Sequence, residues 1–185
     1  MSLENREFLQ EVMRKEIKDR KIPLSLGKTC PVKCTFCYEM DHSYRQTFDM
    51  PLTTQEDWDF ILNEIKVFPT RATESWVLGG NEYMEWTDLA LHPKAMDWIE
   101  EFLEKTDKNI IMFSVGYFDP KRINRLAEKY PGRINFELSV ITLGGYRKQL
   151  MPKGPSVSQV LEVLDGPAVT SANFYSFGPG TMSED

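Results

Sequence analysis

The alternation of strand-like and helical segments is the feature that most constrains the fold of this chain. Apolar runs typical of strands alternate with longer runs typical of helices, and the connections between them are short. Strands are expected at residues 22–30, 75–80, 109–116, 133–141 and 168–176, and helices at 3–20, 53–68, 92–105, 119–130 and 156–165. The strand-like runs are largely apolar without a strict period of two, which favours parallel strands covered by helices. The sequence therefore predicts an α/β protein whose parallel sheet is either open or curled into a barrel.

Helix-start residues support this segmentation. Thr54, which is followed by acidic residues, suits the N-terminus of the helix at 53–68. Asp119 and Pro120 suit the N-cap and the first position of the helix at 119–130. The first helix carries an apolar stripe made of Leu9, Val12, Met13 and Ile17.

Composition and charge exclude several classes of protein. A chain of 185 residues suits one domain with a substantial core, and 41% hydrophobic with 27% charged residues is typical of a globular protein. The longest apolar run, residues 110–118, is shorter than the roughly 18 residues that suggest a membrane span. The charged N-terminus lacks a signal-peptide core, and a net charge of −6 without a long basic tract argues against a nucleic-acid partner. The sequence thus predicts a cytoplasmic protein without a membrane partner, and a reducing compartment also suits free or metal-bound thiols.

All three cysteines of the chain, Cys30, Cys34 and Cys37, lie within eight consecutive positions after the first expected strand. A disulfide switch fits poorly, because three thiols leave one unpaired. A structural zinc ion would take a fourth ligand, for which His42 or Asp41 is available. A four-iron cluster held by three thiolates would instead keep one iron free to bind a small molecule. The cysteines by themselves leave both kinds of site open.

The spacing Cys-x3-Cys-x2-Cys, with the aromatic residue Phe36 before the last cysteine, resembles the signature of the radical S-adenosylmethionine (SAM) superfamily. The motif also follows a first strand, at the edge where the active sites of parallel α/β barrels gather. The resemblance implies that the three cysteines hold a [4Fe-4S] cluster and that Phe36 packs near the cluster or the adenine.

A second similarity lies after the second expected strand. The segment VLGGNE, residues 77–82, resembles the Gly-Gly-Glu segment of the same superfamily, whose backbone contacts the amino group of SAM. Gly79 and Gly80 would leave room for a ligand to approach the backbone closely, although an ordinary glycine turn has the same sequence. Asn81 precedes Glu82, so either residue can occupy the third position of the family segment.

Two further residues correspond to family positions. Ser139, at the end of the fourth expected strand, matches a polar residue that contacts the SAM ribose, and Arg147 matches a basic residue that pairs with the SAM carboxylate. A guanidinium suits that role because it can donate two hydrogen bonds to one carboxylate. The structural alternatives are a strand residue on the pleated surface for Ser139 and a solvated helix residue for Arg147. Catalytic residues are not assigned by these motifs.

The resemblance covers residues 24–177 and implies a partial (β/α)6 TIM-like barrel of parallel strands with outer helices. About five β/α units are expected here, with an N-terminal amphipathic helix at 1–21 and a radical SAM core domain at 22–185. The segment TMSE, residues 181–184, has capping-box spacing, so we expect another helix and a longer protein.

The implied activity is that of a radical SAM enzyme, an oxidoreductase or a transferase. The cluster would cleave SAM reductively to methionine and a 5′-deoxyadenosyl radical, which abstracts hydrogen from an unidentified substrate. An electron donor such as a flavodoxin or ferredoxin is implied, and the substrate could be a small molecule, a peptide or RNA. The alternatives are a zinc-binding interaction module, in which His42 completes the set Cys30, Cys34 and Cys37, and an electron-transfer protein that holds a cluster without cleaving SAM.

Overall fold

The computed structural model describes residues 3–27, 32–35, 51–69, 74–79 and 89–173. The expected capping box at 181–184 lies outside these residues, as do His42 and Asp41. Among the described residues, no helix has the length and the apolar character needed to cross a membrane.

The described residues form a five-stranded sheet in which every neighbouring pair is parallel. The strands are β1 (Lys21–Ile22), β2 (Ser75–Leu78), β3 (Asn109–Ser114), β4 (Ile134–Ser139) and β5 (Val169–Asn173). Their order in the sheet, β1-β2-β3-β4-β5, is the order in the chain. The predicted α/β class and parallel sheet are therefore confirmed. The first strand is much shorter than expected, because residues after Ile22 leave the sheet ladder.

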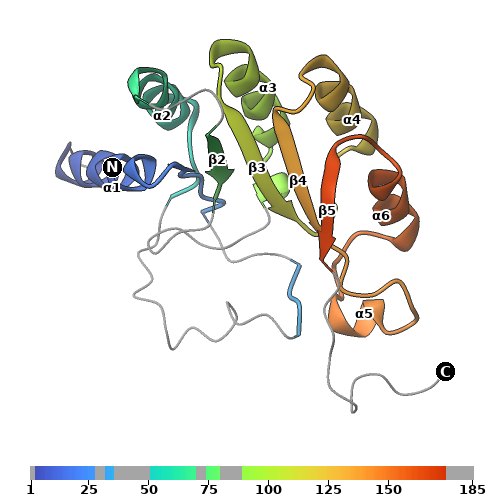
Figure 1. The fold of residues 1–185 in the computed structure, drawn as a ribbon. Helices are drawn as coiled ribbons and strands as arrows, with labels where there is room; N and C mark the ends of the chain where they lie inside the picture. The colour runs from blue at the N-terminus through green and yellow to red at the C-terminus, as the bar shows by residue number, and fades with distance from the viewer. Residues whose placement is uncertain (1–2, 28–31, 36–50, 70–73, 80–88, 174–185) are drawn as a thin grey trace.

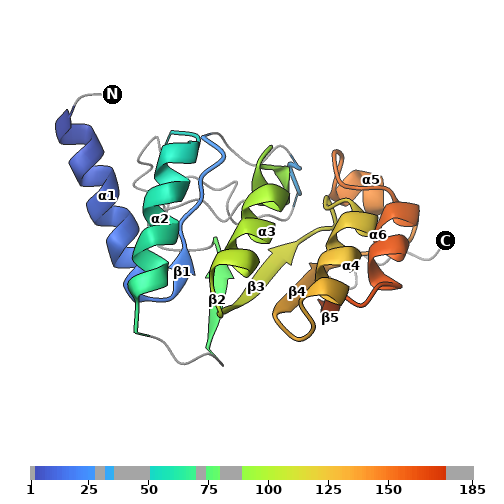
Figure 2. The same cartoon turned by 90° about the horizontal axis from the view of Figure 1, so that it is seen from above.

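Helices connect and flank the strands of this sheet. They are α1 (Leu3–Lys18), α2 (Gln55–Val67), the 3-10 turn η3 (Leu89–Leu91), α3 (Ala95–Lys105), α4 (Pro120–Lys129), α5 (Arg147–Leu150) and α6 (Val157–Leu164). In Figures 1 and 2, α2, α3, α4 and α6 lie on the same side of the strands. The short helix α5 was not expected from the sequence, and it lies beyond the carboxyl end of β4 and β5 (Figure 1).

The predicted helix starts are correct in atomic detail. Thr54 is the N-cap of α2: its hydroxyl accepts from the Asp57 amide at 3.2 Å, and its own amide donates to the Asp57 carboxylate at 2.9 Å. Asp119 is the N-cap of α4, with its carboxylate accepting from the Lys121 amide at 3.0 Å. These caps satisfy amide groups that have no partner inside the helix.

Burial alternates along the central strands, because successive side chains point to opposite faces. The helix-covered face is fully apolar at its centre, where Phe118 meets Phe136 edge-on with ring centroids 5.0 Å apart. This face contributes Trp76, Leu78, Ile110, Met112, Phe136 and Leu138 to the main core.

The N-terminal helix belongs to the same core. Leu9, Met13 and Ile17 of α1 are all buried, as the apolar stripe predicted, and they join the cluster that includes the sheet residue Ile22. The helix thus stabilises the edge of the sheet from which the cysteine segment departs.

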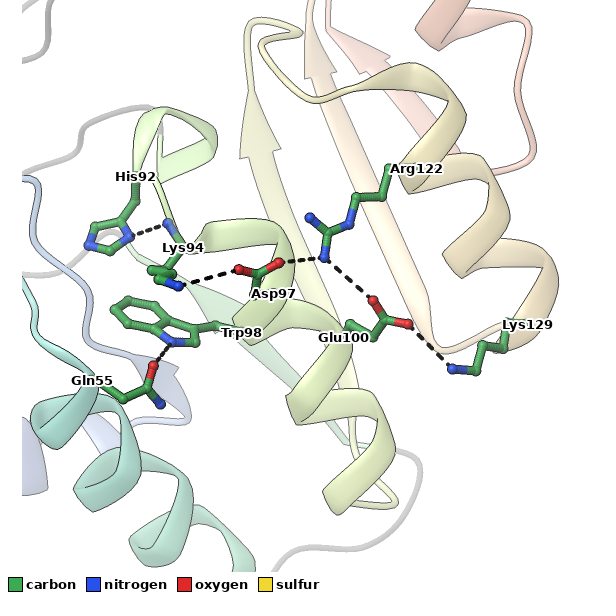
Figure 3. Close-up of polar contacts among 8 residues, drawn as sticks. All are labelled: Gln55, His92, Lys94, Asp97, Trp98, Glu100, Arg122 and Lys129. Atoms are coloured by element: carbon green, nitrogen blue, oxygen red, sulfur yellow. Dashed lines mark hydrogen bonds and ion pairs between the residues drawn. The ribbon is translucent and has the colours of Figure 1, made fainter.

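Charged side chains link the outer surfaces of α3 and α4. Arg122 donates to Asp97 at 2.6 Å and lies 3.5 Å from Glu100, while Lys129 bridges Glu100 at 3.3 Å (Figure 3). These pairs lie at the surface, so each is worth less than about 1 kcal/mol. They link the neighbouring helices α3 and α4 but contribute little to the stability of the fold.

Candidate functional site

The carboxyl ends of the strands gather the residues that the sequence singles out. Because all neighbouring strands pair in parallel, their carboxyl ends lie at the same edge of the sheet, toward which α5 also lies (Figure 1). The cysteine segment follows β1, Gly79 follows β2, Ser139 ends β4 and Arg147 opens α5. In open parallel sheets and barrels, this edge is where ligands bind.

The described part of the cysteine motif is a short turn, residues 32–35. Val32 is buried and Cys34 is half-buried, whereas Cys30, Phe36 and Cys37 lie outside the described residues. Val32 packs with two residues that follow β4, and we call this group of Val32, Ile141 and Met151 the edge cluster. Half-buried side chains of Cys34, Leu91, Val115, Tyr117 and Leu150 pack around it. One cysteine of the motif is therefore held at the carboxyl edge of the sheet.

The base of the cysteine segment is closed by reciprocal hydrogen bonds. The Ser25 amide donates to the Thr53 hydroxyl at 2.7 Å, and the Thr53 amide donates to the Ser25 carbonyl at 3.1 Å. Between them and the motif, Gly27 has φ of 64°, and a Cβ there would lie 2.5 Å from the Leu52 amide nitrogen. Only glycine satisfies both the backbone conformation and the close approach at this point.

His92 holds Thr53 from the other side. Its Nε2 lies 3.2 Å from the Thr53 carbonyl, its Nδ1 accepts from the Lys94 amide at 3.1 Å, and its ring stacks on Trp98 (Figure 3). Because a carbonyl only accepts, Nε2 carries the proton and the imidazole is neutral. Burial lowers the pKa of His92, and the hydrogen bond to Thr53 opposes this only in part. The histidine therefore anchors Thr53, the residue that pairs with Ser25, and no local pattern in the sequence indicates this contact.

Gly79 is the described member of the glycine segment. It follows β2 with φ of 77°, and its amide donates to the Ile22 carbonyl at 3.1 Å. This left-handed conformation favours glycine, in agreement with a turn at the end of β2. Gly80, Asn81 and Glu82 lie outside the described residues, so their proposed contacts to SAM stay predictions.

Ser139 lies on the sheet face opposite the helices, which no helix of the described residues covers and which we call the open face. Toward the carboxyl ends of β2 and β3 the residues of this face are apolar, namely Val77, Ile111 and Phe113, whereas Ser75 and Asn109 at the amino ends of these strands are polar. The residues of this face on β4 and β5 are polar: Asn135, Glu137, Ser139, Ser171 and Asn173. A register shift after Phe136 aligns Ser139 with Asn173. Such irregularities redirect side chains and occur beside functional sites.

Sequence reasoning missed the polar residues around Ser139 on the open face. Buried parallel strands are usually rich in Val, Ile and Leu on both faces. The alternate polar positions in the β4 segment INFELS, residues 134–139, were the available signal. The half-buried Glu137, with Phe113 and Ser171 as its register neighbours, is the most polar of them.

Arg147 differs most from its expected surroundings. The side chain is only 5% exposed, so the alternative of a solvated helix residue is wrong. Its Nε donates to the Pro155 carbonyl at 3.0 Å, and its Nη1 donates to the carbonyls of Val140 at 2.6 Å and Thr142 at 2.8 Å. Burial lowers the pKa of the guanidinium, while electrostatic interaction with the nearby Cys34 and Tyr117 opposes this shift. Arg147 and Cys34 thus interact electrostatically at the sheet edge.

Within the described ranges, no group of three His, Cys, Asp or Glu residues is close enough to hold a metal ion. Comparisons with protein-family models, with curated proteins and with solved structures found no match. The assignment of the candidate site therefore rests on the spacing of the cysteines in the sequence and on the position of Cys34 in the fold.

Proposed function

We propose that this chain is a radical SAM enzyme whose three clustered cysteines hold a [4Fe-4S] cluster. The observation that carries the proposal is the position of the motif: it lies in the connection that follows β1, and Cys34 lies at the carboxyl edge of a parallel sheet. We also propose the finer fold that the resemblance implies, a partial (β/α)6 barrel. Parallel strands in chain order are consistent with adjacent units of such a barrel.

The chemistry of the donor set fits this group. Thiolates are the usual ligands of iron–sulfur clusters, and three of them leave one iron open. Cys34 is half-buried beside apolar side chains. This position also suits a cluster, because the reduction potential of an iron–sulfur cluster depends on its burial. When bound, the cluster and SAM would supply reductive cleavage of a carbon–sulfur bond and abstraction of a substrate hydrogen.

The residues of this chain would bind and orient the reactants. Gly79, with Gly80, Asn81 and Glu82, would form the SAM-binding turn after β2, and Ser139 would contact the ribose. The open face would receive the substrate, with apolar contacts from β2 and β3 and hydrogen bonds from β4 and β5. A cytoplasmic flavodoxin or ferredoxin would supply the electron.

Anaerobic reconstitution with iron and sulfide tests the proposal. We expect brown protein with the visible absorbance of an iron–sulfur cluster, and formation of 5′-deoxyadenosine from SAM after addition of dithionite. The Cys34→Ala variant should lose both, whereas Thr35→Ala, which shortens an exposed side chain whose hydroxyl donates to the Leu150 carbonyl at 3.5 Å, should keep both.

The other outcomes identify the competing functions. Colourless protein that binds stoichiometric zinc would overturn the proposal in favour of the zinc-binding module with Cys30, Cys34, Cys37 and His42. Brown protein that leaves SAM intact would favour an electron-transfer protein. Wild-type SAM cleavage by Cys34→Ala would refute the assignment of this cysteine.

A further inference from the structure

Arg147 is a buried arginine that has no carboxylate partner among the described residues. Among the described residues, Arg147 makes hydrogen bonds only to backbone carbonyls, and its Nη2 is buried without a partner. Burying a charged group costs free energy unless the group is paired and hydrogen-bonded, so the role of the hydrogen bonds that Arg147 makes needs an explanation. The three carbonyls belong to Val140, Thr142 and Pro155, which span the whole connection from β4 to α6.

Two of these carbonyls flank a strained residue. Ile141 has φ of 62°, a left-handed conformation that is unfavourable for a β-branched side chain. The Thr142 amide donates to the Val140 carbonyl at 2.7 Å, which closes a tight three-residue turn around Ile141. Strained backbone persists only where its surroundings determine it. Here Nη1 of Arg147 binds the carbonyl on each side of Ile141, and thereby holds the turn closed.

This strained turn is one half of the contact with the cysteine segment. The Ile141 side chain is 5% exposed and packs on Val32 in the edge cluster. On the facing segment, Lys33 also has a left-handed φ, of 54°, immediately before Cys34. The Thr35 amide then donates to the carbonyl of Leu150, the last residue of α5, at 2.9 Å.

We propose that Arg147 is a positioning residue for Cys34. Its hydrogen bonds hold the turn at Ile141 and the start of α5. These two parts form the surface on which residues 32–35 pack in the metal-free chain, and we call this surface the seat. The role differs from the SAM carboxylate contact that the resemblance implies, because Nε and Nη1 are already bound to the chain's own carbonyls. The structural role of Arg147 does not depend on the proposed function. Only the purpose of the seat, which is to present Cys34 to a cluster, rests on the proposed function.

Arg133 provides a matched control. Its guanidinium also donates to three backbone carbonyls, those of Leu103 at 2.8 Å, Thr106 at 2.9 Å and Lys108 at 2.7 Å. These carbonyls precede β3, at the amino edge of the sheet and away from the cysteine segment. Replacing either arginine by lysine keeps the charge but removes the planar fork, since one ammonium cannot reproduce the same set of bonds.

Hydrogen exchange of the metal-free full chain tests the proposal. In Arg147→Lys, we expect the Thr35 amide to exchange at least about ten-fold faster than in wild type, while the amides of β3 keep their protection. Arg133→Lys should leave the Thr35 amide unchanged. An unchanged Thr35 amide in Arg147→Lys, or an equal acceleration in Arg133→Lys, would overturn the proposal.

Two additions keep the test decisive. If Arg147→Lys does not fold, Val32→Ala reduces the same contact from the cysteine side and should accelerate exchange at Thr35, and unchanged exchange there would overturn the seat. In a separate arm, iron bound per chain after reconstitution should fall in Arg147→Lys but not in Arg133→Lys, and equal iron in both variants would count against a role for the seat. Wild-type protein that binds no iron would refute the proposed function, while the exchange data would still decide the role of Arg147.

Discussion

Acidification should destabilise this protein through His92. In the folded state the ring is 3% exposed, neutral and protonated on Nε2, with Nδ1 accepting from the Lys94 amide. A second proton would have to enter at Nδ1, where it would face that amide and break the bond. Burial accordingly lowers the pKa of His92 below its ordinary value of 6.5. The unfolded chain therefore takes up a proton that the folded chain resists.

The sign and size of the change in unfolding free energy follow from this difference in proton binding. Above the ordinary pKa of 6.5 both states are neutral, so stability is unaffected; below it, stability falls until the folded pKa is reached. The slope cannot exceed about 1.4 kcal/mol per pH unit. Between about pH 7.5 and pH 5.5, the unfolding free energy should therefore decrease by at most about 1.4 kcal/mol through this group.

Urea denaturation at several pH values, compared between wild type and His92→Asn, measures the effect. Asparagine does not titrate, and its side-chain oxygen can accept from the Lys94 amide as Nδ1 does. His42 is present in both proteins, so the difference between them isolates His92. The variant should lose less stability on acidification than wild type. Identical pH dependence in the two proteins would refute the reasoning.

Three further substitutions test the packing around the site. Gly27→Ala should lower the unfolding free energy by at least about 2 kcal/mol, because it combines left-handed strain with a clash against the Leu52 backbone, and unchanged chemical denaturation would contradict this. Phe136→Ala should cost about 3–5 kcal/mol through loss of a fully buried ring that contacts Phe118, and a melting temperature close to wild type would argue against the packing described. Asp119→Ala should cost about 1 kcal/mol by removing the N-cap of α4, with Asp119→Asn close to neutral as the control.

Local signals predicted the helices well. Thr54 and Asp119 cap α2 and α4 where the sequence places them, because capping involves only neighbouring residues. The predicted first strand was too long, because its end depends on a contact between residues that are distant in the sequence. Residues after Ile22 are apolar and buried like strand residues, yet their backbone turns away so that Ser25 can pair with Thr53, a partner that no local pattern identifies.

The position of the candidate site in the fold was predictable, but its supporting contacts were not. The cysteine spacing and the expected strand together suggested that Cys34 would lie at the carboxyl edge, as it does. The burial of Arg147 was not predictable, because arginine is usually exposed and its carbonyl partners meet only after β4 and α6 pack. Likewise, the tie from His92 to Thr53 joins residues 39 positions apart.

The separation in sequence between the cysteine turn, residues 32–35, and the residues on which it packs has a consequence for the order of folding. Thr35 and Leu150 are 115 positions apart, so a growing chain displays its cysteines long before their seat exists. Because each strand pairs first with its predecessor, the earlier strands can form during synthesis while residues 32–35 wait for β4 and the turn beyond it. Loading of a cofactor would then be a late event, after release of the seat-forming residues from the ribosome. Nascent chains arrested before and after residue 151 has left the ribosome should differ accordingly in the protection of Cys34 from a thiol reagent.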